Sequence, residues 1–174
     1  MKKKAITASK KRVNGRKKGA NAERRLAKLF SDWWGTEFAR TPLSGGFSTK
    51  TFREDWNAAG DLVTPDPAFP FCVESKKVEG WKMEHLLTQK NSLLHDWWNQ
   101  TLKETPEGKI PLLVFTKNRT PLFAMMPWRS GKFKQCMPYF EYSFEDNEAL
   151  NNPNNEVVIF ELKYLLATDK KVWL

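Results

Sequence analysis

The sequence contains few of the residues that build cysteine or histidine centres. Its 174 residues include only two cysteines, Cys72 and Cys136, and two histidines, His85 and His95. Two cysteines exclude a disulfide scaffold and a four-cysteine zinc site, and two histidines argue against zinc catalysis at a histidine-rich centre. Any metal site is therefore expected to use oxygen ligands.

Long apolar runs are also missing. No apolar segment reaches the ~20 residues that a membrane-spanning helix needs, and the basic N-terminus is not followed by the apolar stretch of a signal peptide. These absences predict a cytoplasmic protein without membrane contacts. With 40% hydrophobic and 28% charged residues, the composition is ordinary for one globular domain that buries its own core.

Acidic residues are absent from the first 18 positions, which hold nine lysines and arginines. The rest of the chain carries equal numbers of basic and acidic residues, so the net charge of +9 resides in this arm. A concentrated basic arm favours a polyanionic partner, most simply nucleic acid. The alternative is a flexible tail that only aids solubility.

Apolar periodicity and turn residues predict an ordered α/β (α+β) fold after the arm. We expect a single domain with a mixed central β-sheet flanked by helices. The expected helices cover 20–34 and 83–103, and the expected strands cover 61–63, 69–77, 110–116, 122–126 and 157–162, with a hairpin turn at 117–120 and irregular structure at 127–155. We divide the chain into a basic arm (1–18), a core (19–126) and a C-terminal extension (127–174) with room for an extra strand.

The expected strand 69–77 has two different faces. Side chains alternate along a strand, so Phe71 and Val73 share an apolar face, whereas Cys72, Glu74 and Lys76 share the other. A carboxylate beside an ammonium is suited to holding a metal ion and meeting a phosphate. By itself, however, Glu-x-Lys is more often an ordinary ion pair on a solvated face.

Two further acids strengthen the first interpretation. Asp61 follows Gly60 and is separated from Glu74 by 12 residues, which is enough for a hairpin that brings both carboxylates to one divalent ion. Glu23 is the only charged residue within the apolar arc of helix 20–34, and a buried carboxylate is costly unless it is paired or binds metal. The alternatives are that Asp61 caps a turn and that Glu23 is half-buried near the helix N-terminus.

In this order, four segments resemble the motifs of the PD-(D/E)xK nuclease superfamily, and more specifically those of archaeal-type Holliday junction resolvases. The segments are 18–24 (KGANAER), 40–46 (RTPLSGG), 60–63 (GDLV) and 73–77 (VESKK). The resemblance covers residues 17–126 and implies a restriction-endonuclease-like core.

The resemblance also implies a role for each residue. Asp61 and Glu74 would bind Mg²⁺, or Mn²⁺ as a substitute, with the Ser75 carbonyl as a neutral ligand and Glu23 completing the metal site. Lys76 would position the attacking water and stabilise the charge at phosphorus. No organic cofactor is expected. The residues expected to contact DNA are Arg24, Arg40, Ser44, Lys17 and Lys18.

The sequence therefore predicts a metal-dependent, structure-selective endodeoxyribonuclease that acts as a homodimer on four-way (Holliday) junctions. The alternatives are a restriction-like or flap/repair nuclease, and a catalytically silent DNA-binding protein with the same fold. Two smaller questions stay open. Either Gln89 or Gln100 on the expected helix 83–103 is a candidate neighbour of the metal site, and Trp56 and Trp81 are candidates for stacking on DNA bases.

Overall fold

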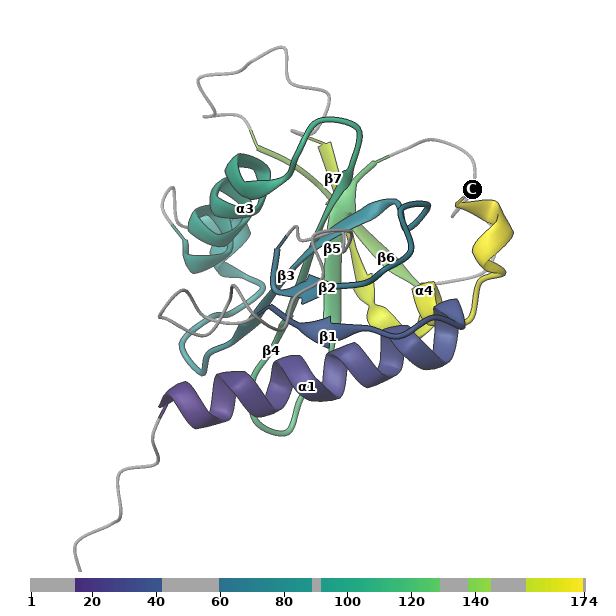
Figure 1. Cartoon of the computed structure of the whole chain (residues 1–174). Helices are drawn as coiled ribbons and strands as arrows, with labels where there is room; N and C mark the ends of the chain where they lie inside the picture. The colour runs from purple at the N-terminus through teal and green to yellow at the C-terminus, as the bar shows by residue number, and fades with distance from the viewer. Residues whose placement is uncertain (1–14, 42–59, 89–91, 129–137, 145–155, 174) are drawn as a thin grey trace, which may run out of the picture.

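The computed structural model describes residues 15–41, 60–88, 92–128, 138–144 and 156–173 (Figure 1). The basic arm up to residue 14, Ser44, Trp56, Gln89 and Cys136 lie outside the described residues. The elements in chain order are α1 (Gly15–Trp34), β1 (Ala39–Arg40), β2 (Leu62–Val63), β3 (Phe71–Lys77), α2 (His85–Thr88), α3 (Leu93–Glu104), β4 (Ile110–Thr116), β5 (Phe123–Pro127), β6 (Tyr139–Ser143), β7 (Glu156–Glu161), α4 (Leu162–Leu166) and the 3₁₀ turn η1 (Lys170–Val172).

A mixed five-stranded sheet forms the centre of the described structure, with strands in the order β3-β4-β5-β7-β6. β3 and β4 are parallel, and the other neighbouring pairs are antiparallel. The crossover between the parallel strands runs through α2 and α3. β1 and β2 form a separate antiparallel pair. The predicted single domain with a mixed sheet flanked by helices is confirmed.

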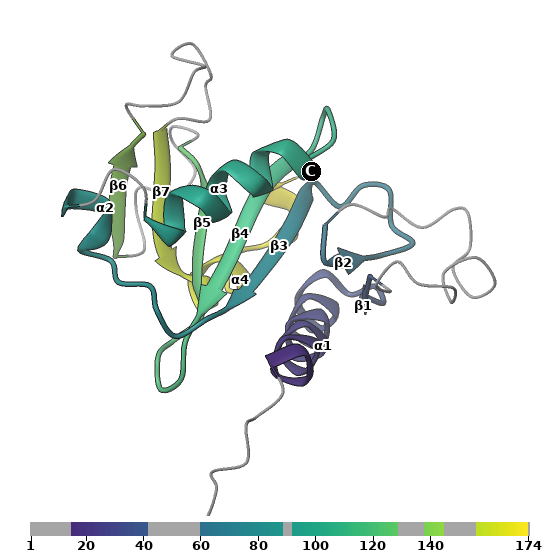
Figure 2. The same cartoon turned by 90° about the vertical axis from the view of Figure 1, so that its left-hand side faces the viewer.

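The two faces of the sheet are covered by different helices (Figure 2). α1 and α4 pack on one face, where Leu112 and Val114 of β4 contribute to the core, and α3 packs on the other, where Leu113 and Phe115 contribute. Burying each of these side chains contributes roughly 1.5–3 kcal/mol. Because both faces are covered, β4 reads as a continuous apolar run rather than an alternating one.

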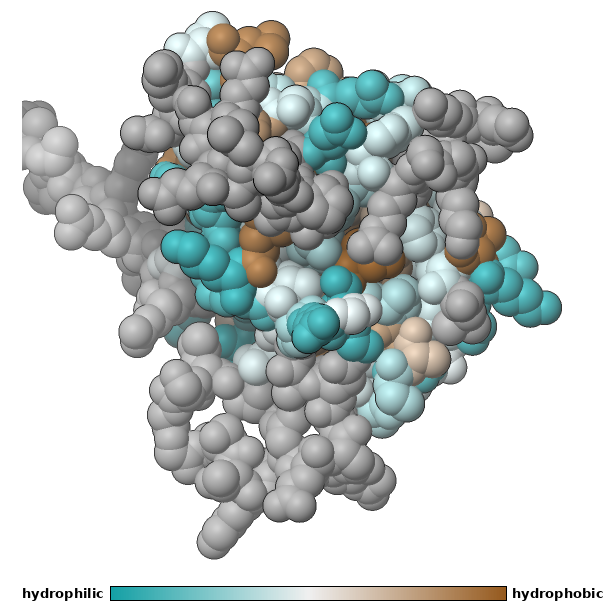
Figure 3. Space-filling model, turned by 90° about the horizontal axis from the view of Figure 1, so that it is seen from above, coloured by the Kyte–Doolittle hydropathy of each residue, from teal (hydrophilic) through white to brown (hydrophobic). Residues whose placement is uncertain are grey.

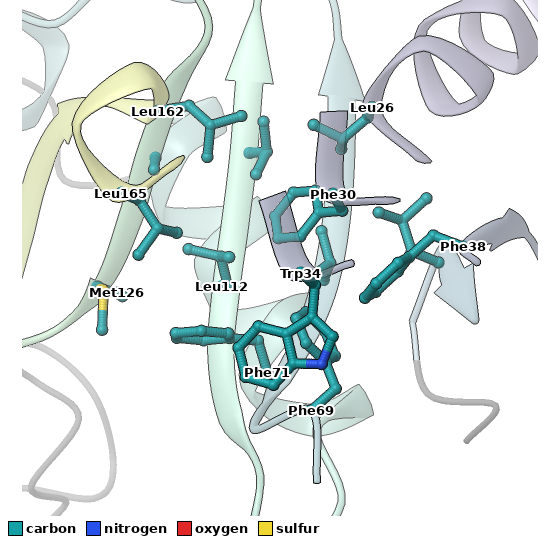
Figure 4. Packing of buried hydrophobic residues seen from close by; sticks show 14 of the residues in the cluster. Leu26, Phe30, Trp34, Phe38, Phe69, Phe71, Leu112, Met126, Leu162 and Leu165 are labelled. Carbon is teal, nitrogen blue, oxygen red and sulfur yellow. The ribbon is translucent and has the colours of Figure 1, made fainter. Parts of the chain in front are cut away.

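α1 packs on the sheet through side chains spaced four residues apart. Leu26, Phe30 and Trp34 enter a cluster that includes Phe69 and Phe71 (Figure 4). The helix ends at Gly35, whose φ of 79° suits the residue that follows a helix. The other end differs from the prediction, since α1 starts at Gly15 rather than near residue 20. Lysine and arginine are good helix formers, which explains how the helix extends through this basic stretch.

The predicted helix over 83–103 is wrong, because two helices occupy that region. Ser92 has an extended backbone and caps α3, accepting a hydrogen bond from the His95 N–H while the His95 ring accepts one from the Ser92 N–H. Leucines on both sides of this cap continue the helical spacing, so periodicity alone hides the break. In α2, Leu86 is buried in the same cluster as Leu94 and Trp98 of α3, whereas Leu87 is 72% exposed.

The hairpin between β4 and β5 is confirmed, with Arg119 in its turn at φ 63°. β6 lies within the segment predicted to be irregular, and that part of the prediction is wrong. β6 has no apolar alternation, since Tyr139, Phe140 and Glu141 are all exposed. Its position is set instead by pairing with β7.

The described surface seen from above is mainly hydrophilic or neutral, with hydrophobic residues in small separate patches (Figure 3). Among the described helices, none combines the length and the apolar character needed to cross a membrane.

Candidate active site

Asp61 is attached to the outer edge of β3 by backbone geometry. Gly60 forms a parallel bridge with Val73, and the Asp61 N–H donates to the Val73 carbonyl at 2.8 Å. The Asp61 carboxylate in turn accepts the Ser75 N–H at 2.8 Å. The expected hairpin is wrong in its pairing, because β2 pairs with β1 and the contact with β3 is parallel. The parallel contact with the edge of β3 nevertheless brings Asp61 beside residues 73–75.

Gly60 makes the close approach to β3 feasible. Its φ is 74°, and a Cβ at this position would lie 2.4 Å from the Val73 carbonyl oxygen. Any side chain would therefore clash with backbone as well as strain the dihedral angle. Thr41, the residue after β1, fixes the same turn, because its hydroxyl donates to the Gly60 carbonyl at 2.6 Å.

Glu74 and Lys76 share the face of β3 that is turned toward α3, as their alternation predicts. Glu74 is 5% exposed, and the Lys76 Nζ donates to its Oε1 at 2.5 Å. Burial raises the pKa of Glu74 to about 7, and the negative charge of Asp61 adds to this effect, while Lys76 opposes it. Burial also raises the pKa of Asp61, and the charge of Glu23 acts in the same direction.

These shifts describe two partly desolvated carboxylates whose negative charges disfavour each other. A positive charge placed between them would relieve both effects. The ammonium of Lys76, which contacts Glu74, is also hydrogen-bonded to Gln100 of α3.

Gln100 of α3 connects Lys76 to a further acid. The Lys76 Nζ donates to the Gln100 Oε1 at 2.9 Å, and the Gln100 Nε2 donates to the Glu104 Oε1 at 2.9 Å. Of the two candidate glutamines, Gln100 contacts Lys76, and Gln89 lies outside the described residues. Glu104 is not among the residues predicted from the sequence. The available signal was its spacing of four residues from Gln100, which places both on one face of a helix.

Glu23 and Arg40 form an ion pair on the opposite side, between α1 and β1. The Arg40 Nε donates to the Glu23 carboxylate, and both side chains are largely buried, with exposures of 21% for Arg40 and 17% for Glu23. Glu23 is therefore paired rather than open to solvent, and its charge acts on Asp61. The sequence predicts Glu23 at the metal site and Arg40 at a DNA phosphate. In the structure these two residues contact each other.

The basic residues expected to contact DNA lie at several positions. Lys17 and Arg24 are exposed on α1, and Lys18 is half-buried. Arg24 donates to the Asn21 side chain at 2.9 Å. Trp81 is not available for base stacking, because it is 3% exposed and packs edge-on against Phe115.

A sequence model of the family described as "Phage putative PDDEXK endonuclease" matches residues 14–173. The chain belongs to this family. No match was found among curated proteins or among solved structures.

PDDEXK membership confirms the predicted superfamily, and the mixed sheet of the chain is consistent with the restriction-endonuclease-like fold. The family is one of nucleases, which are hydrolases, and it implies DNA as the substrate.

PDDEXK nucleases generally use divalent metal ions. Within the described residues, no group of three or more His, Cys, Asp and Glu side chains is arranged to hold one. The donors that are present still fit Mg²⁺, which prefers oxygen and usually takes one or two protein carboxylates while keeping several waters. Asp61 and Glu74 supply two such carboxylates, and burial raises the pKa of both.

Proposed function

We propose that this PDDEXK nuclease is a Mg²⁺-dependent endodeoxyribonuclease whose active site is built from Asp61, Glu74 and Lys76. The observation that carries the proposal is the meeting of the buried Glu74 carboxylate, the half-buried Asp61 carboxylate and the Lys76 ammonium at the edge of β3. Glu23 and the carbonyl of Ser75 complete the proposed metal-binding groups. Mn²⁺ is the expected substitute.

The carbonyl of Ser75 is suited to this role because of its place in the strand. In an extended strand, the N–H and the C=O of one residue point to the same side. Since the Ser75 N–H faces the Asp61 carboxylate, its carbonyl oxygen faces the same edge.

The chain's own groups divide the work of phosphodiester hydrolysis. A divalent ion held by Asp61 and Glu74 would acidify a bound water and neutralise charge at phosphorus. The negative charges of the Asp61 and Glu74 carboxylates would keep this ion in the site. Lys76 donates hydrogen bonds to the attacking water or to a non-bridging phosphate oxygen, in a site where burial strengthens such contacts. Arg40, Ser44, Arg24, Lys17 and Lys18 are proposed to contact flanking phosphates.

We propose a four-way DNA junction as the preferred substrate, cut by a homodimer that presents one site to each of two strands. The support is the resemblance of segments 18–24, 40–46, 60–63 and 73–77 to resolvase motifs. A restriction-like or flap/repair nuclease would use the same chemistry on another DNA shape. The presence of all three acids and the lysine weighs against a catalytically silent protein.

The test offers three labelled DNAs to the full chain with Mg²⁺: a four-way junction, a flap and a linear duplex of the same arm sequence. We expect paired, symmetric nicks in the junction and little cutting of the duplex. The Asp61→Asn variant serves as the inactive control for contaminating nucleases. Equal cutting of the linear duplex would remove the junction proposal, and binding without cutting in Mg²⁺ or Mn²⁺ would remove the catalytic one.

A further inference from the structure

Gln100 occupies a position between two opposite charges. Its side-chain oxygen lies 2.9 Å from the Lys76 Nζ, and its side-chain nitrogen lies 2.9 Å from the Glu104 Oε1. Gln100 is half-buried, whereas Glu104 is exposed at the end of α3. The end of α3 is also tied to β3, because the Cys72 thiol approaches the Glu104 carbonyl oxygen at 3.7 Å. The chain Glu104–Gln100–Lys76–Glu74 thus runs from the surface to the buried carboxylate.

The chemistry of the three groups sets the orientation of the amide. An ammonium only donates hydrogen bonds, an ionised carboxylate only accepts them, and a glutamine does both from different atoms. Its oxygen must therefore face Lys76 and its nitrogen must face Glu104. Both neighbours favour this orientation, and without Glu104 only the hydrogen bond from Lys76 would hold the amide in it.

A lysine side chain is flexible, and holding its ammonium at one point costs conformational entropy. In the described residues, two of the three N–H groups of Lys76 are used, one by Glu74 and one by Gln100. Two acceptors on different elements fix the nitrogen and leave one N–H for a water or a phosphate oxygen. If only Glu74 held the lysine, the ion pair would remain, but the third N–H would no longer point in a fixed direction.

We propose that Glu104, acting through Gln100, is a positioning residue that aims the Lys76 ammonium at the reacting phosphate. The inference rests on the proposed function, since it deepens the role of Lys76 in DNA cleavage. Neither Gln100 nor Glu104 needs to touch DNA. Their removal should therefore lower kcat and leave KM for DNA nearly unchanged.

The kinetic test uses steady-state cleavage with Mg²⁺. Gln100→Leu should lower kcat about 30-fold, and Glu104→Ala about 5-fold. Both effects are smaller than the roughly 100- to 1000-fold cost of losing an oriented donor outright, because the Lys76 donor itself is kept. KM should change by less than about 2-fold, because uniform binding is not affected. Glu107→Ala is the matched control: it removes an exposed acid near the same helix end that forms no hydrogen bond with Gln100. An equal effect of Glu107→Ala would overturn the proposal.

A reciprocal exchange distinguishes the hydrogen-bond chain from general damage. Gln100→Glu alone places two carboxylates against each other and should lower kcat. Adding Glu104→Gln restores the sequence of acceptor and donor, because the carboxylate at 100 faces Lys76 and the amide at 104 donates to it. The double variant also has the net charge of the original protein. It should recover kcat at least about 5-fold over Gln100→Glu. Failure to recover would overturn the proposal.

A readout on the metal-free protein separates this inference from the proposed function. The ¹⁵Nζ signal of Lys76 should show a high order parameter by NMR, and it should fall in Gln100→Leu and Glu104→Ala but not in Glu107→Ala. An unchanged order parameter overturns the inference even if the enzyme cuts DNA. Lost order with unchanged kcat overturns it as well. If the original protein cuts none of the DNAs, the proposed function fails, and the NMR comparison alone decides whether Glu104 positions the lysine.

Discussion

The two helices beside β3 supply different chemistry to the same strand. α1 presents cations to solvent, and its Glu23 forms an ion pair with Arg40 of β1. α3 carries almost no excess charge and supplies the neutral amide of Gln100. The exposed basic residues of α1 are Lys17, Arg24, Arg25 and Lys28, whereas the exposed charged residues of α3 are Asp96, Lys103 and Glu104.

This difference indicates which side of β3 faces the DNA backbone. Phosphates are attracted to the α1 side, where cations outnumber acids. Near α3, the exposed carboxylate of Glu104 would repel a phosphate, so this side is free to orient Lys76 from behind. This asymmetry supports the proposed roles of the two helices, with a DNA-binding side at α1, a positioning side at α3, and Asp61 and Glu74 between them.

The largest effect is expected where the two sides meet. Asp61→Asn and Glu74→Gln should each lower cleavage at least about 1000-fold, since each removes charge that holds the metal ion. Both variants conserve shape and a hydrogen-bond acceptor for the Ser75 N–H or Lys76. Junction binding measured in Ca²⁺ should stay within about 3-fold. More than a tenth of the original activity in either variant would contradict the assignment.

Gly60 provides the next test, because it attaches the α1 side to β3. Gly60→Ala should lower the free energy of unfolding by about 3 kcal/mol and abolish cleavage, since its Cβ would meet the Val73 carbonyl and displace Asp61. The control is Gly108→Ala, which has a φ of 81° but nothing within 4 Å of its Cβ. This variant should lose only about 1 kcal/mol in urea denaturation and keep its activity. Equal losses would show that the close approach is unimportant.

The sequence predicts one part of the site well. The alternation on β3 places Glu74 and Lys76 together, because a strand has a fixed period and the apolar positions Phe71 and Val73 identify the buried face toward α1. Asp61 is found because glycine before an acid indicates an unusual turn. Both signals are local. They can be read from the sequence because each depends only on residues a few positions away.

The remaining part of the site depends on tertiary packing. Glu104 acts through Gln100, and its role appears only when α3 is placed over β3. The partnership of Glu23 with Arg40 likewise depends on how β1 lies against α1. The break before α3 is hidden for another reason, since Ser92 sits between leucines that continue the helical spacing. β6 is ordered by its pairing with β7, which no local pattern indicates.

The pH dependence of stability gives a third, smaller effect, at Glu74 between the two sides. In the metal-free protein the pKa of Glu74 is raised from 4.5 to about 7, so folding favours its protonated form. Its contribution to stability is complete below pH 4.5 and is lost as the pH rises through 7. The unfolding free energy should fall over this range by on the order of 2 kcal/mol more than in Glu74→Gln. Parallel urea-denaturation profiles of the two proteins would contradict the raised pKa.

The smallest effect should come from the cations of α1, and it tests the comparison most directly. Replacing Arg24 and Arg25 together with glutamine should weaken junction binding about 5-fold at moderate salt and reduce the slope of log K against log salt by about 2, since two phosphate contacts are lost. kcat at saturating DNA should not change. Lys103→Gln is the matched control on α3, where the same loss of an exposed cation should leave both affinity and salt slope unchanged. If Lys103→Gln weakened binding as much per charge as the α1 variant, DNA would contact both helices, and Glu104 would then have to tolerate a phosphate beside it.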